Sequence, residues 1–258
     1  CLVGSEMCIR DSFGTLTVLL TFLLGKDLYS SRTGFLSGLI LATSFQFAYL
    51  STRANIDTML TFFTTASLYV FSKWYRGRKE KKNDGRKIGS LSIYGFYVGM
   101  AFATLAKGPA GFLLPLLVSL LYLAMQKDWK AIREMKLLPG MLLFCGIVLS
   151  WYIPAVVRGG ENYLNMTLFR HTIARYSEGW AKPRPIFYYF YNFPIDFFPW
   201  ILFFPAAILY GYSREMIEKR KEFFFLILWF ALIFLFFSLS KGKRGLYLLP
   251  LYPAASLM

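Results

Sequence analysis

The sequence contains few of the residues that build disulfide frameworks, metal centres and acidic surfaces. It has 3 cysteines, 1 histidine and 14 acidic residues in a chain of 258. The cysteines show no C-x-x-C spacing and Cys145 lies inside an apolar run, so neither a disulfide framework nor a thiolate metal site is indicated. The single histidine, His171, cannot form a metal site alone.

Apolar residues are abundant, and they are collected into blocks. The sequence is 56% hydrophobic and 19% aromatic with a mean hydropathy of +0.46, above the roughly 45–50% apolar content of soluble domains. Blocks of about 15–20 residues are long enough to cross a hydrocarbon core about 30 Å thick. The sequence therefore predicts an all-α, polytopic transmembrane bundle with about 8–9 membrane segments. The blocks are Phe13–Leu24, Gly34–Leu50, Thr58–Phe71, Leu91–Leu105, Ala110–Ala124, Leu137–Val157, Phe197–Tyr212, Phe223–Leu239 and Leu246–Met258.

The formal charge of +15 would favour nucleic acid as the partner of a soluble protein, but the basic residues here lie mostly between apolar blocks. Such segments orient a membrane protein with its lysines and arginines toward the cytoplasm, so we expect the bilayer, and no nucleic acid, as a partner. The expected cytoplasmic segments are Gly25–Arg32, Lys73–Lys87, Lys127–Lys136 and Ser213–Glu222. Alternation across the bilayer then places on the outer side Ser51–Asp57, Lys107–Pro109, Arg158–Asp196 and Lys241–Arg244.

Asp57 stands at the start of an apolar block, one helical turn after Arg53. A carboxylate there can simply cap the helix, because the unpaired N–H groups and the dipole of a helix N-terminus favour negative charge. An acidic residue beside a membrane helix can equally hold a metal, a sugar hydroxyl or a catalytic proton. Both interpretations stay open, and the spacing lets Arg53 pair with Asp57.

The segment Lys107-Gly108-Pro109-Ala110-Gly111 interrupts a long apolar stretch. Glycine next to proline predicts a hairpin turn that needs no function. The turn does not explain a lysine at the apolar boundary. Lys107 could extend toward the interface or bind a phosphate there.

The outer segment Arg158–Asp196 is long for a simple connection, which is typical of functional or disordered loops. Arg170, His171 and Arg175 have helical spacing within it, and a run of aromatic residues follows. The aromatics fit an interfacial belt, and His171 fits an ordinary polar loop residue as well as metal ligation or proton transfer. Asn165-Met166-Thr167 matches the short N-glycosylation pattern, which often occurs by accident.

Three cations, Lys241, Lys243 and Arg244, lie on a short segment that is expected outside. This runs against the tendency of basic residues to stay in the cytoplasm, so an anionic ligand at the interface would explain them. Together with the hydroxyl of Tyr247 they could grip a phosphate or diphosphate head group. A plain basic loop is the alternative.

The outer-side motifs, in chain order, are Arg53-x-x-x-Asp57, Lys107-Gly108-Pro109, Phe169-Arg170-His171-x-x-x-Arg175-Tyr176, Pro199-Trp200 and Ser240-Lys241-x-Lys243-x-x-x-Tyr247-x-x-Pro250. Their order and shared sidedness resemble the bacterial membrane glycosyltransferases related to protein O-mannosyltransferases and to lipid A aminoarabinose transferase. The resemblance covers roughly Ser12 to Met258.

The resemblance implies a GT-C type enzyme of the bacterial inner or plasma membrane. Such an enzyme moves a sugar from a polyprenyl-phosphate carrier to a periplasmic-side acceptor, which is lipid A, another glycolipid or a protein. It implies that Asp57 lies near the sugar and the catalytic centre, and that His171 occupies a position where relatives hold a divalent metal. The implied substrate-binding residues are Arg53, Lys107, Arg170, Arg175, Lys241, Lys243 and Tyr247.

The first residues differ in character from the rest of the sequence. Residues 1–11 match neither a signal peptide nor the segments that follow, so we expect them to be non-native or disordered, with an incomplete glycosyltransferase domain over 12–258. The family's catalytic base is expected in a first outer loop that precedes this sequence. This chain alone is then expected to be inactive.

A transporter or flippase is the main alternative, because many apolar helices with a few embedded charges describe one equally well. It would place ionisable residues near the midplane and show paired halves. Here the charges cluster at one surface and no convincing internal repeat is present. A non-catalytic membrane scaffold, the third class, would not need the outer cations.

Overall fold

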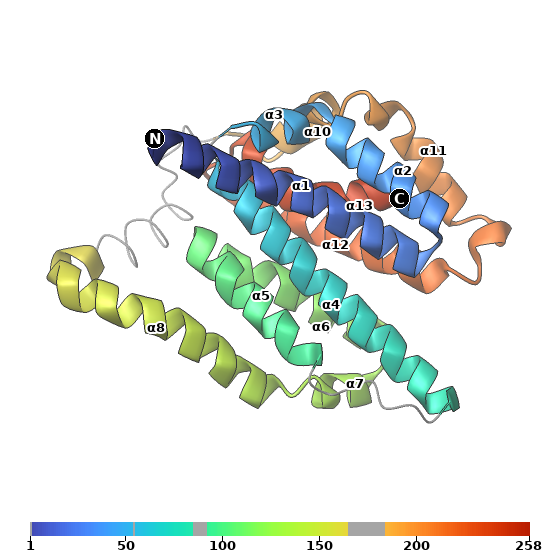
Figure 1. The fold of residues 1–258 in the computed structure, drawn as a ribbon. Coiled ribbons are helices and arrows are strands. Elements are labelled where there is room, and N and C mark those ends of the chain that lie inside the picture. Colours follow the sequence, from blue (N-terminus) through green and yellow to red (C-terminus); the bar gives the residue numbers. More distant parts are fainter. Residues whose placement is uncertain (1, 54, 85–91, 165–183) are drawn as a thin grey trace.

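The computed structural model describes residues 2–53, 55–84, 92–164 and 184–258, and the elements they form are all helices (Figure 1). The all-α prediction is therefore confirmed for these residues. The α-helices are α1 (Leu2–Leu28), α2 (Ser31–Thr43), α3 (Phe45–Ser51), α4 (Ile56–Asp84), α5 (Ser92–Lys107), α6 (Ala110–Met125), α7 (Trp129–Glu134), α8 (Leu137–Leu164), α10 (Tyr188–Asp196), α11 (Phe204–Gly211), α12 (Arg220–Leu239) and α13 (Tyr252–Leu257). The 3₁₀ helices are η2 (Trp200–Leu202), η3 (Arg214–Met216) and η4 (Gly245–Leu251).

Helix α4 lies at the centre of the bundle, where it packs against α1, α5, α6 and η4. The fully buried ring of Phe71 marks its core, stacking on Tyr75 with ring centroids 6.2 Å apart and meeting the edge of Tyr122 at 6.3 Å. Helix α8 packs against α5 at the edge of the bundle (Figure 1). It exposes large apolar side chains such as Trp151 and Val157, as expected of a helix whose solvent is lipid.

By length and composition, two of the described helices can cross a membrane: Leu137–Gly159 within α8, and α12. The pair α2 and α3, bent by 71°, adds a third if it is one broken span. Shorter apolar helices, among them α6, accompany them. The chain is thus a multi-pass membrane protein, whereas the count of about 8–9 segments stays a prediction.

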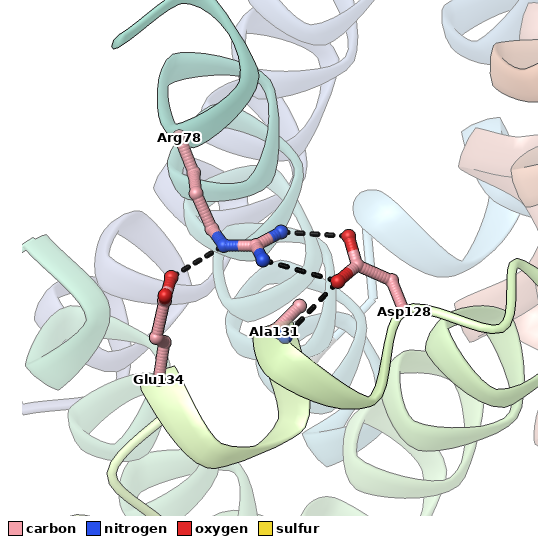
Figure 2. Close-up of polar contacts among 4 residues, drawn as sticks. All are labelled: Arg78, Asp128, Ala131 and Glu134. Atoms are coloured by element: carbon pink, nitrogen blue, oxygen red, sulfur yellow. Dashed lines mark hydrogen bonds and ion pairs between the residues drawn. The ribbon is translucent and has the colours of Figure 1, made fainter. Parts of the chain in front are cut away.

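The basic segments that we expect in the cytoplasm do come together. Arg78, near the end of α4, donates two hydrogen bonds of 2.7 and 3.0 Å to Asp128 and a third to Glu134 (Figure 2). Asp128 also accepts from the backbone N–H of Ala131 at 3.1 Å and so caps α7. These bonds join the segment Lys73–Lys87 to Lys127–Lys136. The hydroxyl of Tyr122 donates to the carbonyl of Lys221, in the segment Ser213–Glu222, at 3.4 Å.

Two of the predicted apolar blocks are interrupted in the structure. The block Gly34–Leu50 is broken at Ser44, whose backbone is extended, because Phe45 donates its N–H to the carbonyl of the distant Phe198 at 3.0 Å. The block Phe197–Tyr212 holds η2 and the 8-residue α11 in place of one long helix. Proline near the first position of α11 explains the new start, since it lacks the N–H that a preceding turn would use.

The segment Arg158–Asp196, predicted as a loop, is helical at both of its described ends. Helix α8 continues to Leu164, and the aromatic run forms α10. The run is helical because Tyr189, Phe193 and Phe197 recur every four residues and are buried on one face. Helix α1 begins at Leu2, within the segment that we expect to be non-native or disordered, and the domain boundaries stay predictions.

Candidate functional site at the outer helix ends

The turn between α5 and α6 places Lys107 as the last residue of α5. Gly108 follows with a φ of +76°, a left-handed conformation that glycine adopts without strain. Gly111 lets the two helices approach closely, because a Cβ there would lie 2.2 Å from the carbonyl carbon of Ala103. The Lys-Gly-Pro motif is therefore a tight hairpin that holds one cation at the end of a helix, where the dipole favours positive charge.

Asp57 lies in the first turn of α4 and is 4% exposed. Its backbone N–H donates to the side-chain oxygen of Asn55 at 3.2 Å, so the side-chain cap of this helix is supplied by Asn55. The carboxylate of Asp57 instead forms an ion pair with Lys107. Sequence spacing missed this partner because it lies 50 residues away.

The ring of Tyr247, in η4, completes this cluster. The ammonium of Lys107 lies 4.2 Å from its centroid, within the range of a cation–π interaction. Lys107 thus contacts a carboxylate and an aromatic face while 20% of its side chain stays exposed. A cation in this setting is neutralised when no ligand is bound and is still accessible to an anion such as a phosphate.

The other predicted cations lie elsewhere. The guanidinium of Arg53 lies 4.2 Å from the centroid of the Tyr49 ring, whereas the ion pair that Asp57 makes is with Lys107. Lys241 is exposed. Lys243 is only 3% exposed and donates hydrogen bonds to the carbonyls of Ser240 at 2.6 Å and Arg184 at 3.2 Å. Those contacts give Lys243 a structural role, because they hold the loop before η4 in place.

Three predicted site residues, Arg170, His171 and Arg175, lie outside the residues that the structure describes. Their roles, and the divalent metal expected at His171, stay predictions. Within the described ranges no group of three or more His, Cys, Asp or Glu residues is placed to hold a metal ion.

Sequence reasoning missed a second buried carboxylate, Asp196, at the end of α10. It is 6% exposed, and its burial raises its pKa to about 6. The amide of Asn192, one turn earlier, donates to it. The signal in the sequence is an acidic residue inside an aromatic run, because a carboxylate is costly to bury among apolar side chains and therefore indicates a function.

Comparisons with known proteins show which family and fold the chain shares. The model of the dolichyl-phosphate-mannose-protein mannosyltransferase family matches residues 10–169. An uncharacterized protein of Aquifex aeolicus is 29% identical over 246 residues, which are 95% of this chain and 46% of that protein. The undecaprenyl phosphate-α-4-amino-4-deoxy-L-arabinose arabinosyl transferase of Pectobacterium atrosepticum is also 29% identical, over 94% of this chain and 42% of its own length.

Among solved structures, ArnT from Cupriavidus metallidurans bound to undecaprenyl phosphate has the same fold. It superimposes with a TM-score of 0.81 at 20% identity, covering 98% of this chain and 44% of that one. The apo form of the same protein gives 0.77. The chain spans less than half the length of these relatives.

Proposed function

The chain belongs to the dolichyl-phosphate-mannose-protein mannosyltransferase family. On that premise we propose that it is part of a membrane glycosyltransferase that uses a polyprenyl-phosphate sugar as its donor. The relatives named for an undecaprenyl phosphate-linked sugar support this donor class. The acceptor is a glycolipid, with lipid A as the first candidate, or a protein. The reaction takes place at the periplasmic face, because the candidate site lies opposite the basic cytoplasmic segments.

The observation that carries this proposal is the contact of Lys107 with Asp57 and Tyr247 at the outer helix ends. In the reaction, an acceptor nucleophile forms a bond to the anomeric carbon as the bond from that carbon to the carrier phosphate breaks. The phosphate leaves with the bonding electrons, so negative charge develops on its oxygens. A fixed cation in a partly buried site stabilises that charge more than water does.

The ion pair gives each partner a role in this proposal. Before the carrier binds, Asp57 neutralises Lys107 and fixes its position. A carrier phosphate then competes for the ammonium, and the carboxylate of Asp57 gains acceptor capacity toward hydroxyl groups in the catalytic centre. The acceptor's proton passes to a carboxylate base, which the family resemblance places in a first outer loop.

The test uses the full-length protein in liposomes and measures transfer from an undecaprenyl-phosphate sugar. Lys107→Gln should lower kcat by about 10²–10³-fold, the usual effect of removing one donor to a developing oxyanion. Tyr247→Phe, which keeps the ring and removes the hydroxyl, should weaken carrier binding by about 10-fold if that hydroxyl binds the phosphate.

The matched control is Lys26→Gln, a cation with an exposed side chain at the cytoplasmic end of α1. Its transfer rate should equal that of the wild type. Equal rates for Lys107→Gln and Lys26→Gln would refute the assignment of Lys107 to the carrier phosphate.

A further inference from the structure

Three polar side chains, one from α3 and two from α10, meet at the start of η4. Gly245 is the first residue of η4, and a Cβ built on it would lie 2.8 Å from the amide nitrogen of Asn192. The same Cβ would lie 3.0 Å from a carboxylate oxygen of Asp196 and 3.5 Å from the amide nitrogen of Gln46. Glycine at this position therefore lets the backbone of η4 lie against these three polar side chains, which together form a small polar cradle, and a larger residue would collide with them.

The carboxylate of Asp196 is expensive to bury where it lies. The ring of Phe193 stacks on that of Phe197 at 5.3 Å, and the ring of Tyr252 meets both, so aromatic groups surround the end of α10. Within the described part of the chain, no cation lies within ion-pair distance of Asp196, and Asn192 is its hydrogen-bond donor. Burying a charged group without a charged partner costs several kcal/mol in general, so this group calls for a function.

A second buried polar group lies in the same aromatic cluster, and this one has no hydrogen-bond partner among the described residues. Tyr252 is fully buried, and its hydroxyl makes no hydrogen bond within the described residues. The contacts that Tyr252 makes with Phe193 and Phe197 use its ring and not its hydroxyl. Buried polar groups without partners in the protein are explained when a ligand supplies the partner.

The cradle lies next to the cluster around Lys107. Gly245 and Tyr247 are two residues apart in η4, which corresponds to about 4 Å along a 3₁₀ helix. The hydroxyl of Tyr189 donates to the carbonyl of Arg244 at 3.0 Å and so holds the start of η4 against α10. The cluster around Lys107 and the cradle therefore lie at neighbouring residues of η4, close enough to hold a phosphate and the sugar attached to it.

We propose that Asp196, Asn192 and Gln46 form a subsite for the hydroxyl or amino groups of the sugar on the carrier. This inference rests on the proposed function, since it takes the sugar to be attached to a phosphate at Lys107. A carboxylate accepts hydrogen bonds from hydroxyl or ammonium groups, and the two amides both donate and accept. Such a set distinguishes a sugar ring from a bare phosphate.

The experiment compares the affinity of the full-length protein for bare undecaprenyl phosphate with its affinity for the same carrier bearing a sugar. Two sugars are used, 4-amino-4-deoxy-L-arabinose and mannose. In the wild type at least one sugar should tighten binding by about 10-fold or more, the usual effect of hydrogen bonds to a charged group. Asp196→Asn and Gly245→Ala should both remove this gain and leave the affinity for the bare carrier unchanged.

Unchanged binding of the bare carrier also shows that each variant is folded. The inference is overturned if neither sugar tightens binding in the wild type, or if the gain survives both substitutions. Transfer is measured separately on the same samples. A wild type that binds the sugar through Asp196 and transfers none of it would refute the proposed reaction and leave the subsite supported.

Discussion

The ion pair between Asp57 and Lys107 predicts that stability and transfer respond differently to the same substitutions. Lys107→Gln leaves the carboxylate of Asp57, whose side chain is 5% exposed, without its counter-charge. Breaking a buried pair in this way costs about 3–5 kcal/mol. Asp57→Asn should cost less, about 2 kcal/mol, because the Lys107 side chain is 20% exposed and keeps the face of Tyr247.

The double variant Asp57→Asn/Lys107→Gln separates the two roles. It replaces the ion pair by two neutral amides that can hydrogen-bond to each other, so it should lose only about 1 kcal/mol relative to the wild type. Transfer should not recover with stability, since the double variant still lacks the cation for the leaving phosphate. Its kcat should stay about 10²–10³-fold below that of the wild type.

Stability would be measured by reversible unfolding of the full-length protein in mixed micelles, and transfer from an undecaprenyl-phosphate sugar on the same preparations. The double variant is the decisive sample. If it is as unstable as Lys107→Gln, the two side chains are not coupled as described. If it is stable and transfers at the wild-type rate, Lys107 does not act on the phosphate.

Three further predictions concern the scaffold. Arg78→Ala should cost about 1 kcal/mol at neutral pH, because the hydrogen bond from Arg78 holds the pKa of Asp128 below its usual value in a partly exposed pair. In unfolding measurements this cost should shrink as the pH falls through the lowered pKa, because the carboxyl of Asp128 is then protonated and its stabilisation is lost. Gly111→Ala should destabilise the protein by about 1–3 kcal/mol, because the new Cβ would collide with the backbone of Ala103. Gly146→Ala has open space around the new Cβ, so in the same unfolding assay it should be neutral or stabilise by up to about 1 kcal/mol. Lys243→Met should cost about 1–3 kcal/mol, because it leaves the buried carbonyl of Ser240 and the partly buried carbonyl of Arg184 without this donor. A stability equal to the wild type would contradict its structural role.

The helices could be predicted from the sequence because the bilayer fixes how long an apolar block must be. The break at Ser44 could not, since the run Gly34–Leu50 carries no proline to signal it. The bend depends on a tertiary contact, in which the Trp200 indole donates to the Thr43 hydroxyl at 2.8 Å beside the backbone bond from Phe45 to Phe198. Contacts between residues more than 150 positions apart have no counterpart in a local pattern.

Loop charge also predicts which side of the membrane holds the site. The pairing within the site could not be predicted. Sequence spacing offered Arg53 as the partner of Asp57, one turn away, but that guanidinium lies over Tyr49. A helix cap was one of the two interpretations left open for Asp57, and in the structure Asn55 supplies the side-chain cap. Which of two explanations holds for a polar residue depends on neighbours from other helices.

The outer cations show why a count of charges overstates a binding site. Lys241 and Lys243 are two residues apart and equivalent in the sequence, but one is exposed and the other is buried against two backbone carbonyls. Lys243 therefore needs no anionic ligand to explain its place on the outer side. Phosphate binding then depends on Lys107, whose carboxylate partner an incoming anion can replace. A fixed carbonyl cannot be replaced in this way, so affinity for the carrier should depend on Lys107 far more than on Lys243.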